Sequence, residues 1–578
     1  MDALNIESLT FRYRDREEPT IWDLSLSVAA GELLLVAGAS GSGKTTLIRC
    51  INGLVPRSYK GEMQGKVLLH GQDNASMSLA HISQIVGTVL QDPERQILGT
   101  RVRNEVAFGL ENLAVGREEI RERIHEALAY LGIENLGERE TFHLSGGEKQ
   151  KVALAGILAM HPSILLLDEP LASLDPASSQ DTLGLVRRMV DEGMTVVIIE
   201  HRVEDVLGVR PDRVLFLEDG QLRYLGAVEG LASVVNYKEI KLPAAQIVER
   251  AAKDPPPLEV RFSPAIRPVS AAQPVLAEIR GAKPRIFRKG RGYSAGVTLS
   301  SIADLTQPLV RFEGVSFAYG GSQSPAREPN VLEGIDLEIR RGDVVAILGP
   351  NGAGKTTLVK HAIGLLKPQA GRVLVDGVDT RQLSVAQIAS TLGYVFQSPS
   401  HMLFAPTVYE ELAFGPTNLG HPTDLIQKEV QEAIEIVNLL GREKDPPLAL
   451  SFGQQKRVSI AAILAMRSRI LVMDEPTAGQ DYQNYMNFMD TILKLPNFEA
   501  ILFITHDLDL AIIYATRVLL VNQGRLVADG PPQEVLADAG RLKANRIVPT
   551  SLLGINLHYL PRTGRFLRAE ALAHVNLN

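Results

Sequence analysis

The same glycine-rich nonapeptide occurs twice in this chain, as GASGSGKTT at residues 38–46 and as GPNGAGKTT at residues 349–357. Both copies fit the pattern G-x-x-x-x-G-K-[ST], in which backbone N–H groups surround a phosphate at the start of a helix. The lysine of this pattern reaches the β- and γ-phosphates, and the following hydroxyl ligates Mg²⁺. A strand-like apolar run precedes each copy, at 33–37 and at 344–348, which is the context that the pattern requires. The residues expected to hold phosphate are Gly38, Ala39, Ser40, Gly41, Ser42, Gly43, Lys44, Thr45 and Thr46 in the first copy, and Gly349, Pro350, Asn351, Gly352, Ala353, Gly354, Lys355, Thr356 and Thr357 in the second.

The repetition extends far beyond these loops, at a period of about 306 residues. A period of this length indicates a duplicated domain and not a solenoid. In both halves strand-like runs alternate with helical patterns, which is typical of an α/β domain with a parallel sheet. The clearest matched pairs are GTVLQDPERQIL at 87–98 with GYVFQSPSHMLF at 393–404, LSGGEKQKVALAGILAM at 144–160 with LSFGQQKRVSIAAILAM at 450–466, and ILLLDEP at 164–170 with ILVMDEP at 470–476.

Composition narrows the functional classes. The 578 residues suffice for several domains with buried cores. No apolar run approaches the roughly 18–20 residues that span a bilayer, and the start of the chain lacks the pattern of a signal peptide. Cys50 is the only cysteine, which excludes intrachain disulfides, and a net charge of −7 gives no overall attraction to nucleic acid. We therefore expect a protein of the reducing cytoplasm whose contact with a membrane, if any, is peripheral.

Between the halves the repeat stops. KDPPPLEVRFSPAIRP is too rich in proline for a helix or a central strand, and the basic segment RIFRKGRGYSAG follows it. We interpret this region as a flexible linker, with a basic arm on anionic lipid headgroups as the alternative. The predicted domains are residues 1–230 and 308–545, joined by a linker at 231–307 and followed by an extension at 546–578 that has no counterpart in the first half.

An acidic pair ends an apolar strand in each half, where open α/β sheets bind their ligands. Asp168 and Asp474 are expected to hold Mg²⁺ directly or through water. Glu169 and Glu475 follow them and are placed to polarise an attacking water. A solvated strand end is the alternative, but recurrence of the pair in register with the glycine-rich loop favours a catalytic role.

Glutamine and histidine recur in the same register. Gln91 and Gln397 each follow a strand-like run, and their amide groups could ligate Mg²⁺ and hydrogen-bond the nucleophilic water. His201 and His506 end the runs VVIIE and ILFIT, where an imidazole could contact the γ-phosphate and brace the glutamate. A surface glutamine and a structural histidine are the alternatives.

Tyr13 and Tyr319 precede the glycine-rich loops by roughly thirty residues. An aromatic face at this position could stack on adenine, and packing against a sheet is the alternative.

A second phosphate-binding device is predicted at Ser145, Gly146 and Gly147, which open a helical stretch. Each half already has its own glycine-rich loop, so this device needs the nucleotide of another domain. In the second half Ser451 and Gly453 remain, while Phe452 replaces the first glycine. We expect each turn to close over the loop of the other half, so that two ATP molecules are sandwiched, and we expect the site completed by Ser451 and Gly453 to survive the replacement.

These motifs together resemble the ATP-binding cassette (ABC) ATPases, whose Walker A loop, Q-loop, LSGGxxQ signature, Walker B strand with glutamate, and H-loop occur in this order. QDPERQIL, VAFGLENL and LAGILAM are similar to one ATPase subunit of energy-coupling factor (ECF) transporters, and SPSHMLFAPTVYEELAFGPTNL and EPTAGQD to the other. The resemblance implies two P-loop NTPase domains in tandem, each a RecA-like core with a helical subdomain, that hydrolyse ATP with Mg²⁺. It also implies a peripheral place on the cytoplasmic face of the cell membrane, an integral coupling subunit, a substrate-binding membrane subunit, and import of vitamins, their precursors or metal ions.

Two other readings stay open. A twin-cassette protein of the ABC-F type acting on ribosomes also carries two cassettes, although its linker is typically a charged helical hairpin and this one is broken by prolines. Fused sugar-import ATPases are a further possibility within transport. The transported substrate itself leaves no signature, because the ATPase does not touch it.

Overall fold

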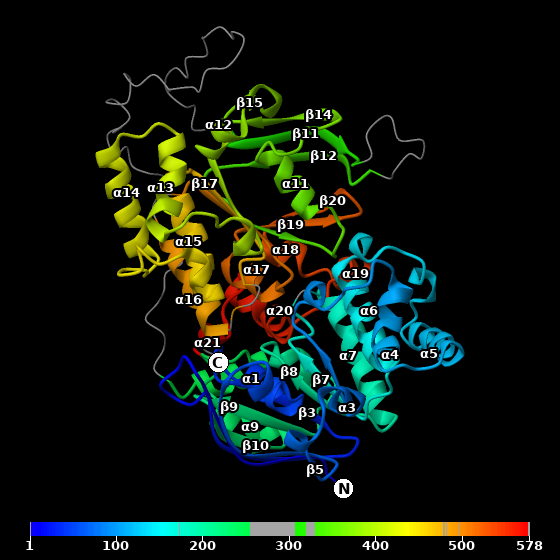
Figure 1. Cartoon of the computed structure of the whole chain (residues 1–578). Helices are drawn as coiled ribbons and strands as arrows, with labels where there is room; N and C mark the ends of the chain where they lie inside the picture. Colours follow the sequence, from blue (N-terminus) through cyan, green and yellow to red (C-terminus); the bar gives the residue numbers. More distant parts are fainter. Residues whose placement is uncertain are drawn as a thin grey trace. The chain divides into compact units, whose positions relative to one another are not determined.

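The computed structural model describes residues 2–172, 174–254, 307–319, 330–477, 480, 482–495 and 498–575. These residues form two compact units, one built mainly from residues 1–250 and the other mainly from residues 251–578. Each unit holds one copy of the repeat and contains two β-sheets and a group of helices (Figure 1). The expected tandem of two α/β domains is confirmed. Among the described residues, no helix combines the length and the apolar character that crossing a membrane requires.

An antiparallel sheet opens the first unit. Its longest strand, β1, buries Leu4, Ile6, Leu9 and Phe11, while most of the residues between them are more exposed, because only one face of this sheet covers the core. In spatial order the strands are β2 (Ile21–Ala29), β1 (Asp2–Tyr13), β4 (Gly61–Leu69) and β5 (Gln72–Asp73).

The central sheet of the first unit carries the motifs. Its inner strands are parallel and buried along their whole length, as expected for a sheet covered on both faces, and β10 pairs antiparallel at one edge. The order is β10 (Gln221–Gly226), β9 (Arg213–Glu218), β3 (Leu33–Ala37), β8 (Thr195–Ile199), β7 (Ile164–Asp168) and β6 (Val86–Val89).

Helices complete the first unit. Helices α4, α5 and α6 pack on one another as a separate helical subdomain, which the cyan ribbon of Figure 1 shows. The helices are α1 (Lys44–Ile51), α2 (Leu54–Arg57), α3 (Leu79–Ile85), α4 (Val102–Asn112), α5 (Arg117–Tyr130), α6 (Gly146–Leu158), α7 (Pro176–Asp191), α8 (Val203–Leu207), α9 (Val228–Val234) and α10 (Ala244–Ala251).

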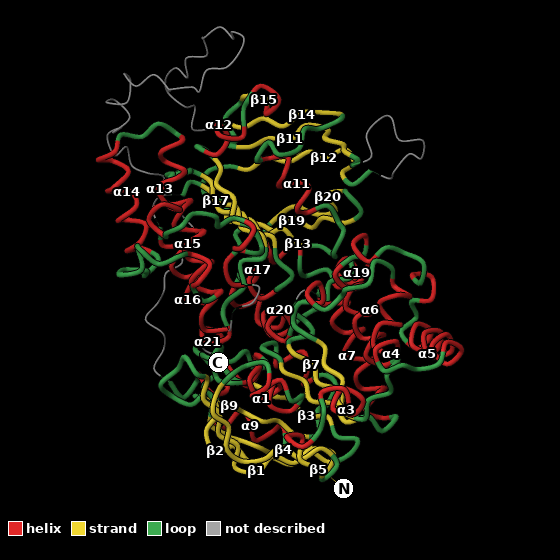
Figure 2. The backbone as a smooth tube through the Cα atoms, in the orientation of Figure 1, coloured by secondary structure: helices red, strands yellow, loops and turns green. Residues whose placement is uncertain are grey.

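The second unit repeats both sheets (Figure 2). Its antiparallel sheet has the order β12 (Leu332–Ile339), β11 (Val310–Phe317), β14 (Ala370–Val375) and β15 (Val378–Asp379). Its central sheet has the order β16 (Leu392–Val395), β17 (Ile470–Asp474), β18 (Ala500–Ile504), β13 (Val344–Leu348), β19 (Arg517–Asn522) and β20 (Arg525–Gly530), with β20 antiparallel at the edge.

Helices α13, α14 and α15 form the helical subdomain of the second unit. The described helices are α11 (Lys355–Ala362), α12 (Val385–Ala389), α13 (Val408–Asn418), α14 (Thr423–Ile436), α15 (Phe452–Ala465), α16 (Tyr482–Lys494), α17 (Leu508–Tyr514), α18 (Pro532–Val535), α19 (Ala539–Ala544), α20 (Ser551–Thr563) and α21 (Ala569–Leu572).

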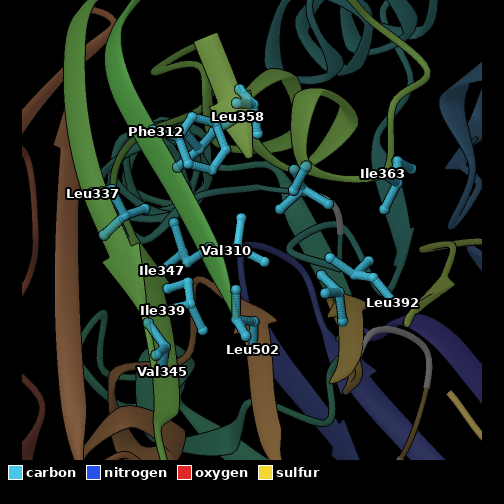
Figure 3. Packing of buried hydrophobic residues seen from close by; sticks show 14 of the residues in the cluster. Val310, Phe312, Leu337, Ile339, Val345, Ile347, Leu358, Ile363, Leu392 and Leu502 are labelled. Atoms are coloured by element: carbon cyan, nitrogen blue, oxygen red, sulfur yellow. The ribbon is translucent and has the colours of Figure 1, made fainter. Parts of the chain in front are cut away.

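One hydrophobic core joins the two sheets of the second unit. Phe312 of β11 and Leu337 of β12 lie in the same buried cluster as Ile347 of β13, Leu358 of α11 and Leu502 of β18 (Figure 3). The core therefore surrounds the helix that follows the glycine-rich loop and fixes the loop against both sheets.

Two segments outside the repeat are partly structured. Helix α9 crosses the predicted start of the linker at residue 231 and α10 lies inside the predicted linker, and Leu231 and Ile247 on them are buried. The proline-rich and basic parts of the predicted linker lie outside the described residues. The C-terminal extension packs on the second unit, where the Thr550 hydroxyl donates to Asp509 at 2.5 Å and Arg568 pairs with Asp490.

Candidate nucleotide-binding sites

The glycine-rich loop of the first unit connects β3 to α1. Gly43 caps α1 in a left-handed conformation with φ of 100°, and no side chain caps the free N–H groups of the first helical turn. A Cβ atom on Gly38 would stand 2.3 Å from the carbonyl oxygen of Leu217, so only glycine fits there. The Lys44 ammonium lies along the loop and donates to the carbonyl oxygens of Gly38 and Ala39, both at 2.8 Å.

The second loop has the same geometry between β13 and α11. Gly354 caps the helix with φ of 100° and without a side-chain cap, and a Cβ on Gly349 would stand 2.0 Å from the carbonyl oxygen of Val521. Lys355 donates to the carbonyl oxygens of Gly349 and Pro350 at 2.7 and 2.9 Å. Both loops therefore present backbone N–H groups and one lysine at the start of a helix, as phosphate binding requires.

Each helix start lies beside the Walker B aspartate. The Thr45 hydroxyl donates to Asp168 at 3.4 Å, and the Thr356 hydroxyl donates to Asp474 at 3.1 Å. A hydroxyl and one carboxylate fit Mg²⁺, which takes oxygen ligands and usually completes its shell with water and substrate phosphates. When bound, the ion would neutralise phosphate charge. Burial, followed by the adjacent Glu169, raises the pKa of Asp168 to about 6.

The two glutamates share an unusual backbone conformation. Glu169 and Glu475 have φ of 50° and 47°, a region that costs free energy for residues other than glycine and is often found at functional sites. In each unit the conformation turns the carboxylate toward the histidine, with Glu169 Oε1 lying 2.9 Å from His201 Nε2 and Glu475 Oε1 lying 3.0 Å from His506 Nε2. The structure thus brings together the predicted glutamate and histidine in both halves.

The Q-loop glutamines differ between the units. Gln91 Nε2 donates to Glu169 Oε2 at 2.7 Å, which joins the first Q-loop directly to the predicted catalytic carboxylate. Gln397 is exposed and makes no such bond to Glu475 in the described part of the chain. Both glutamines are exposed, so the difference between them is the bond to the glutamate, which only Gln91 makes among the described residues.

A cleft of about 360 Å³ in the first unit is lined by many of the residues predicted for its site, but Gly38, Ala39, Ser42, Gln91 and Asp168 are not among its described lining residues. Its lining includes Tyr13, whose hydroxyl lies 3.1 Å from Thr46 and accepts from Arg49 at 3.1 Å. Arg16 and Arg49, which the sequence did not single out, also line it and add positive charge. In the second unit the Tyr319 hydroxyl lies 3.2 Å from Thr357, so both tyrosines are held beside the phosphate-binding helix. The described lining residues of the first cleft are Tyr13, Asp15, Arg16, Thr20, Ser40, Gly41, Gly43, Lys44, Thr45, Thr46, Arg49, Glu169 and His201.

The signature turns lie at the start of helices in the helical subdomains. Ser145 caps α6 by accepting from the Glu148 N–H at 3.3 Å, and Ser451 caps α15 by accepting from the Gln454 N–H at 3.4 Å. Ser145 and Ser451 are exposed. Ser145, Gly146 and Gly147 are not among the described residues that line the cleft of their own unit.

Three side chains near the acidic pairs, Lys456, Tyr394 and Glu200, were not predicted from the sequence to belong to the sites. Gln150, the last residue of the signature, is matched by Lys456 in the second half, so Phe452 is not the only departure there. Tyr394 donates to Asp474 at 2.8 Å where the first half has Thr88. Aligning the two halves could have revealed these differences, but not the contacts that result.

The third missed side chain is Glu200, which precedes His201. It is buried, and burial together with the charge of Glu169 raises its pKa to about 8. Burial also acts on the glutamates predicted to be catalytic, but the His201 hydrogen bond leaves the pKa of Glu169 below its ordinary value, whereas burial and Asp474 raise that of Glu475. Burial lowers the pKa of Lys456 to about 7.

Comparison with known proteins agrees with this geometry. A sequence model described as ABC transporter matches residues 21–172 and 332–478. A provisionally named ABC transporter ATP-binding protein of Vibrio vulnificus is 34% identical over 95% of this chain and 93% of its own length. A protein with the same provisional name from Bacillus anthracis is 33% identical over 98% of this chain and 97% of its own length.

Among solved structures, cbiO1 from Clostridium perfringens, part of the ABC transporter complex cbiONQ, is 32% identical. It matches 45% of this chain and 96% of its own length with a TM-score of 0.38.

The repeated Walker A loops, the acidic pairs beside them and the full-length relatives agree on one assignment. The chain belongs to the ABC transporter family and is an ATPase that carries two cassettes, each binding ATP with Mg²⁺.

Proposed function

We propose that the two cassettes hydrolyse ATP at two composite sites and thereby energise an importer of the energy-coupling factor type. In each site one half supplies the glycine-rich loop, the acidic pair, the glutamine and the histidine, and the other half supplies the signature turn. The first site uses Lys44, Thr45, Gln91, Asp168, Glu169 and His201 with Ser451 and Gly453. The second uses Lys355, Thr356, Gln397, Asp474, Glu475 and His506 with Ser145, Gly146 and Gly147.

The role of each group follows from its chemistry. The lysine and the loop N–H groups hold the phosphates, while threonine and aspartate oxygens hold Mg²⁺. The glutamate, held by the histidine, orients and deprotonates water, and the tyrosine stacks on adenine. The exposed serine at the start of each signature helix supports the cross-pairing, because it is available to a phosphate that comes from outside its own unit.

The observation that carries the transport role is one exposed apolar residue in the loop after each Q-loop glutamine. We call Leu98 and Phe404 the apolar tips of these loops. Leu98 is 68% exposed and Phe404 is 62% exposed. Glu105 is buried and accepts from the backbone N–H groups of Leu98 and Gly99 at 2.7 and 2.6 Å. A carboxylate inside the fold thus fixes the loop and leaves the leucine side chain outside.

The second half builds the same tip. Buried Glu411 accepts from the N–H groups of Phe404 and Ala405, both at 2.8 Å, and the Phe404 ring meets Phe414 edge-on at 4.7 Å. Leu403, next to Phe404 in the chain, is buried. An exposed apolar patch anchored in this way is suited to a partner protein.

We assign these tips to an integral membrane coupling subunit, which works with a substrate-binding membrane subunit. This places the protein at the cytoplasmic face of the cell membrane. The motifs similar to energy-coupling factor ATPases favour a micronutrient as the cargo, namely a vitamin, a vitamin precursor or a metal ion.

Co-purification tests the proposal. The double variant Leu98→Glu with Phe404→Glu should lose its membrane partners and support no uptake, while Mg²⁺-ATP binding stays at the wild-type level. The matched control is Leu79→Glu with Val527→Glu, which places charge on exposed apolar residues of α3 and β20 and should keep the partners. Wild-type co-purification and uptake by the first variant would place the coupling surface elsewhere. Recovery of ribosomes in place of membrane proteins would favour the ABC-F alternative.

A further inference from the structure

Lys456 occupies an unusual place beneath the second acidic pair. It lies on α15, is only 1% exposed, and its Nζ donates to the backbone carbonyl oxygen of Glu475 at 2.7 Å. At the matching position of the first half, Gln150 donates instead to the carbonyl oxygen of Pro170. The second half therefore places a lysine on the carbonyl oxygen of the predicted base itself, whereas the glutamine of the first half contacts the next residue.

Burying an ammonium group costs free energy, because the group loses its hydration. Nearby charges or hydrogen bonds must offset this cost. The neutral amide at the first site makes an analogous backbone contact without that cost. The structure thus provides a reason to look for a role of Lys456 beyond packing. Burial lowers the pKa of Lys456 to about 7, and Glu475 and Asp474 oppose this only in part, so its hydrogen bond to the Glu475 carbonyl oxygen is a contact that fixes the side chain.

The hydrogen bond from Lys456 is made to a residue whose backbone conformation is unfavourable. Glu475 has φ of 47°, and its N–H donates to the carbonyl oxygen of Ile504 at 3.0 Å. With the carbonyl oxygen bonded to Lys456, both polar backbone groups of this residue are held. The direction of the side chain toward His506 depends on this conformation.

Tyr394 acts on the other member of the pair. Its hydroxyl donates to Asp474 Oδ2 at 2.8 Å, the same oxygen that accepts from Thr356 at 3.1 Å. The ring is buried and meets Phe396 edge-on at 4.7 Å, so the hydroxyl is presented from a fixed position. Thr88, the matching residue of the first half, accepts instead from Asn52 at 3.3 Å.

We propose that Lys456 and Tyr394 are positioning residues of the second site, which hold the Glu475 backbone and the Asp474 carboxylate in their reacting geometry. The two sites then differ in the rate of the chemical step and not in affinity for ATP. A displacement of about 1 Å can slow a reaction about 10²-fold, so a modest loosening of either contact has a measurable effect. The inference rests on the proposed roles of Glu475 and Asp474.

Vanadate trapping of 8-azido-[α-³²P]ATP in the full chain resolves the two sites, because labelled peptides report which half retained the trapped product. Lys456→Gln introduces the residue of the first site, and Tyr394→Phe removes only the hydroxyl. Each should lower trapping in the second half by about tenfold, the size of effect typical for a lost hydrogen bond to a charged or strained group. Trapping in the first half and labelling by unhydrolysed nucleotide should remain within about twofold.

Three controls separate the outcomes. Glu475→Gln should abolish trapping in the second half, and if it does not, the assignment of the base itself fails. If Glu475→Gln abolishes trapping but Lys456→Gln and Tyr394→Phe do not reduce it, the positioning role is overturned. Equal loss in both halves, or a variant that does not fold, assigns these side chains a purely structural role and overturns the proposal as well.

Discussion

The two ATP sites of this chain share the contacts of the loop lysine and of the glutamate–histidine pair, and they differ in the layer behind the acidic pair. The loop lysines make the same backbone contacts in both halves, and the glutamate–histidine distances are 2.9 and 3.0 Å. Behind the acidic pair, the first site has Glu200 where the second has Thr505. The second has Lys456 where the first has Gln150.

This comparison teaches that similar reacting geometry can be held in different electrostatic surroundings. The first pair lies near a third buried carboxyl group, whereas the second lies over a buried lysine. Burial raises the pKa of Glu200 to about 8 and lowers that of Lys456 to about 7, so both groups change charge near neutral pH. Two sites that resemble each other in sequence motifs are therefore expected to differ in rate and in response to pH.

The largest effect is expected from the catalytic glutamates. The double variant Glu169→Gln with Glu475→Gln should lower steady-state phosphate release about 10²–10⁴-fold, because a positioned general base typically contributes that much. ATP should still bind, since glutamine keeps the shape of the side chain. Comparing the two single variants measures how far the halves differ. Turnover near the wild-type rate in the double variant would contradict the role of both residues.

A smaller effect should reveal which half completes which site. Ser145→Arg places a bulky cation at the start of α6 and should reduce vanadate trapping at the Lys355 site about 10²-fold, as the loss of a positioned phosphate or oxyanion donor does. Ser451→Arg is the matched variant and should affect the Lys44 site. If each defect appears in the half that carries the substitution, the sites are not composite in the way we propose.

The smallest effect concerns stability and pH. Glu200 has a pKa of about 8 in the fold, above that of an exposed glutamate, so the folded state holds its proton more tightly than the unfolded state. The contribution of this bound proton to the free energy of unfolding should be fully present near pH 4 and should be lost as pH rises toward 8. Glu200→Gln removes this dependence, and the stability of the variant relative to wild type should rise by at least about 1.4 kcal/mol between pH 5 and 8, the value of one pKa unit.

Thermal unfolding of the first unit at both pH values measures this shift. Glu122→Gln, a change at an exposed glutamate of the same unit, should show no such shift. A wild-type protein whose stability relative to Glu200→Gln is constant over this range would show that Glu200 is ionised in the fold.

The fold and the centres of both sites could be predicted because their motifs are local. A glycine-rich loop between a buried strand and a helix fixes its own geometry, and Asp168 and Glu169 follow the end of a strand whose apolar run is visible in the sequence. Repetition removed most of the ambiguity of each motif.

What could not be predicted depends on packing between distant segments. Gln91 and Gln397 occupy matching positions, yet only Gln91 bonds to its glutamate in the described structure. The contact of Lys456 with a carbonyl oxygen depends on how α15 lies against the end of β17, which no local pattern specifies. Likewise α9 and α10 fold in a stretch where prolines downstream suggested an unstructured linker.

The capping boxes on the signature helices have a further consequence. The Ser145 hydroxyl donates to Glu148 at 2.8 Å while accepting from the helix backbone, and Ser451 accepts from the Gln454 N–H. For Ser145, donating to a nucleotide phosphate therefore means giving up the Glu148 carboxylate, whereas the Ser451 hydroxyl can keep accepting from the Gln454 N–H while it donates to a phosphate. Because the net gain from one such exchange is small, we expect the proposed Lys355 site to depend on the glycine N–H groups of the signature turn as much as on the Ser145 hydroxyl.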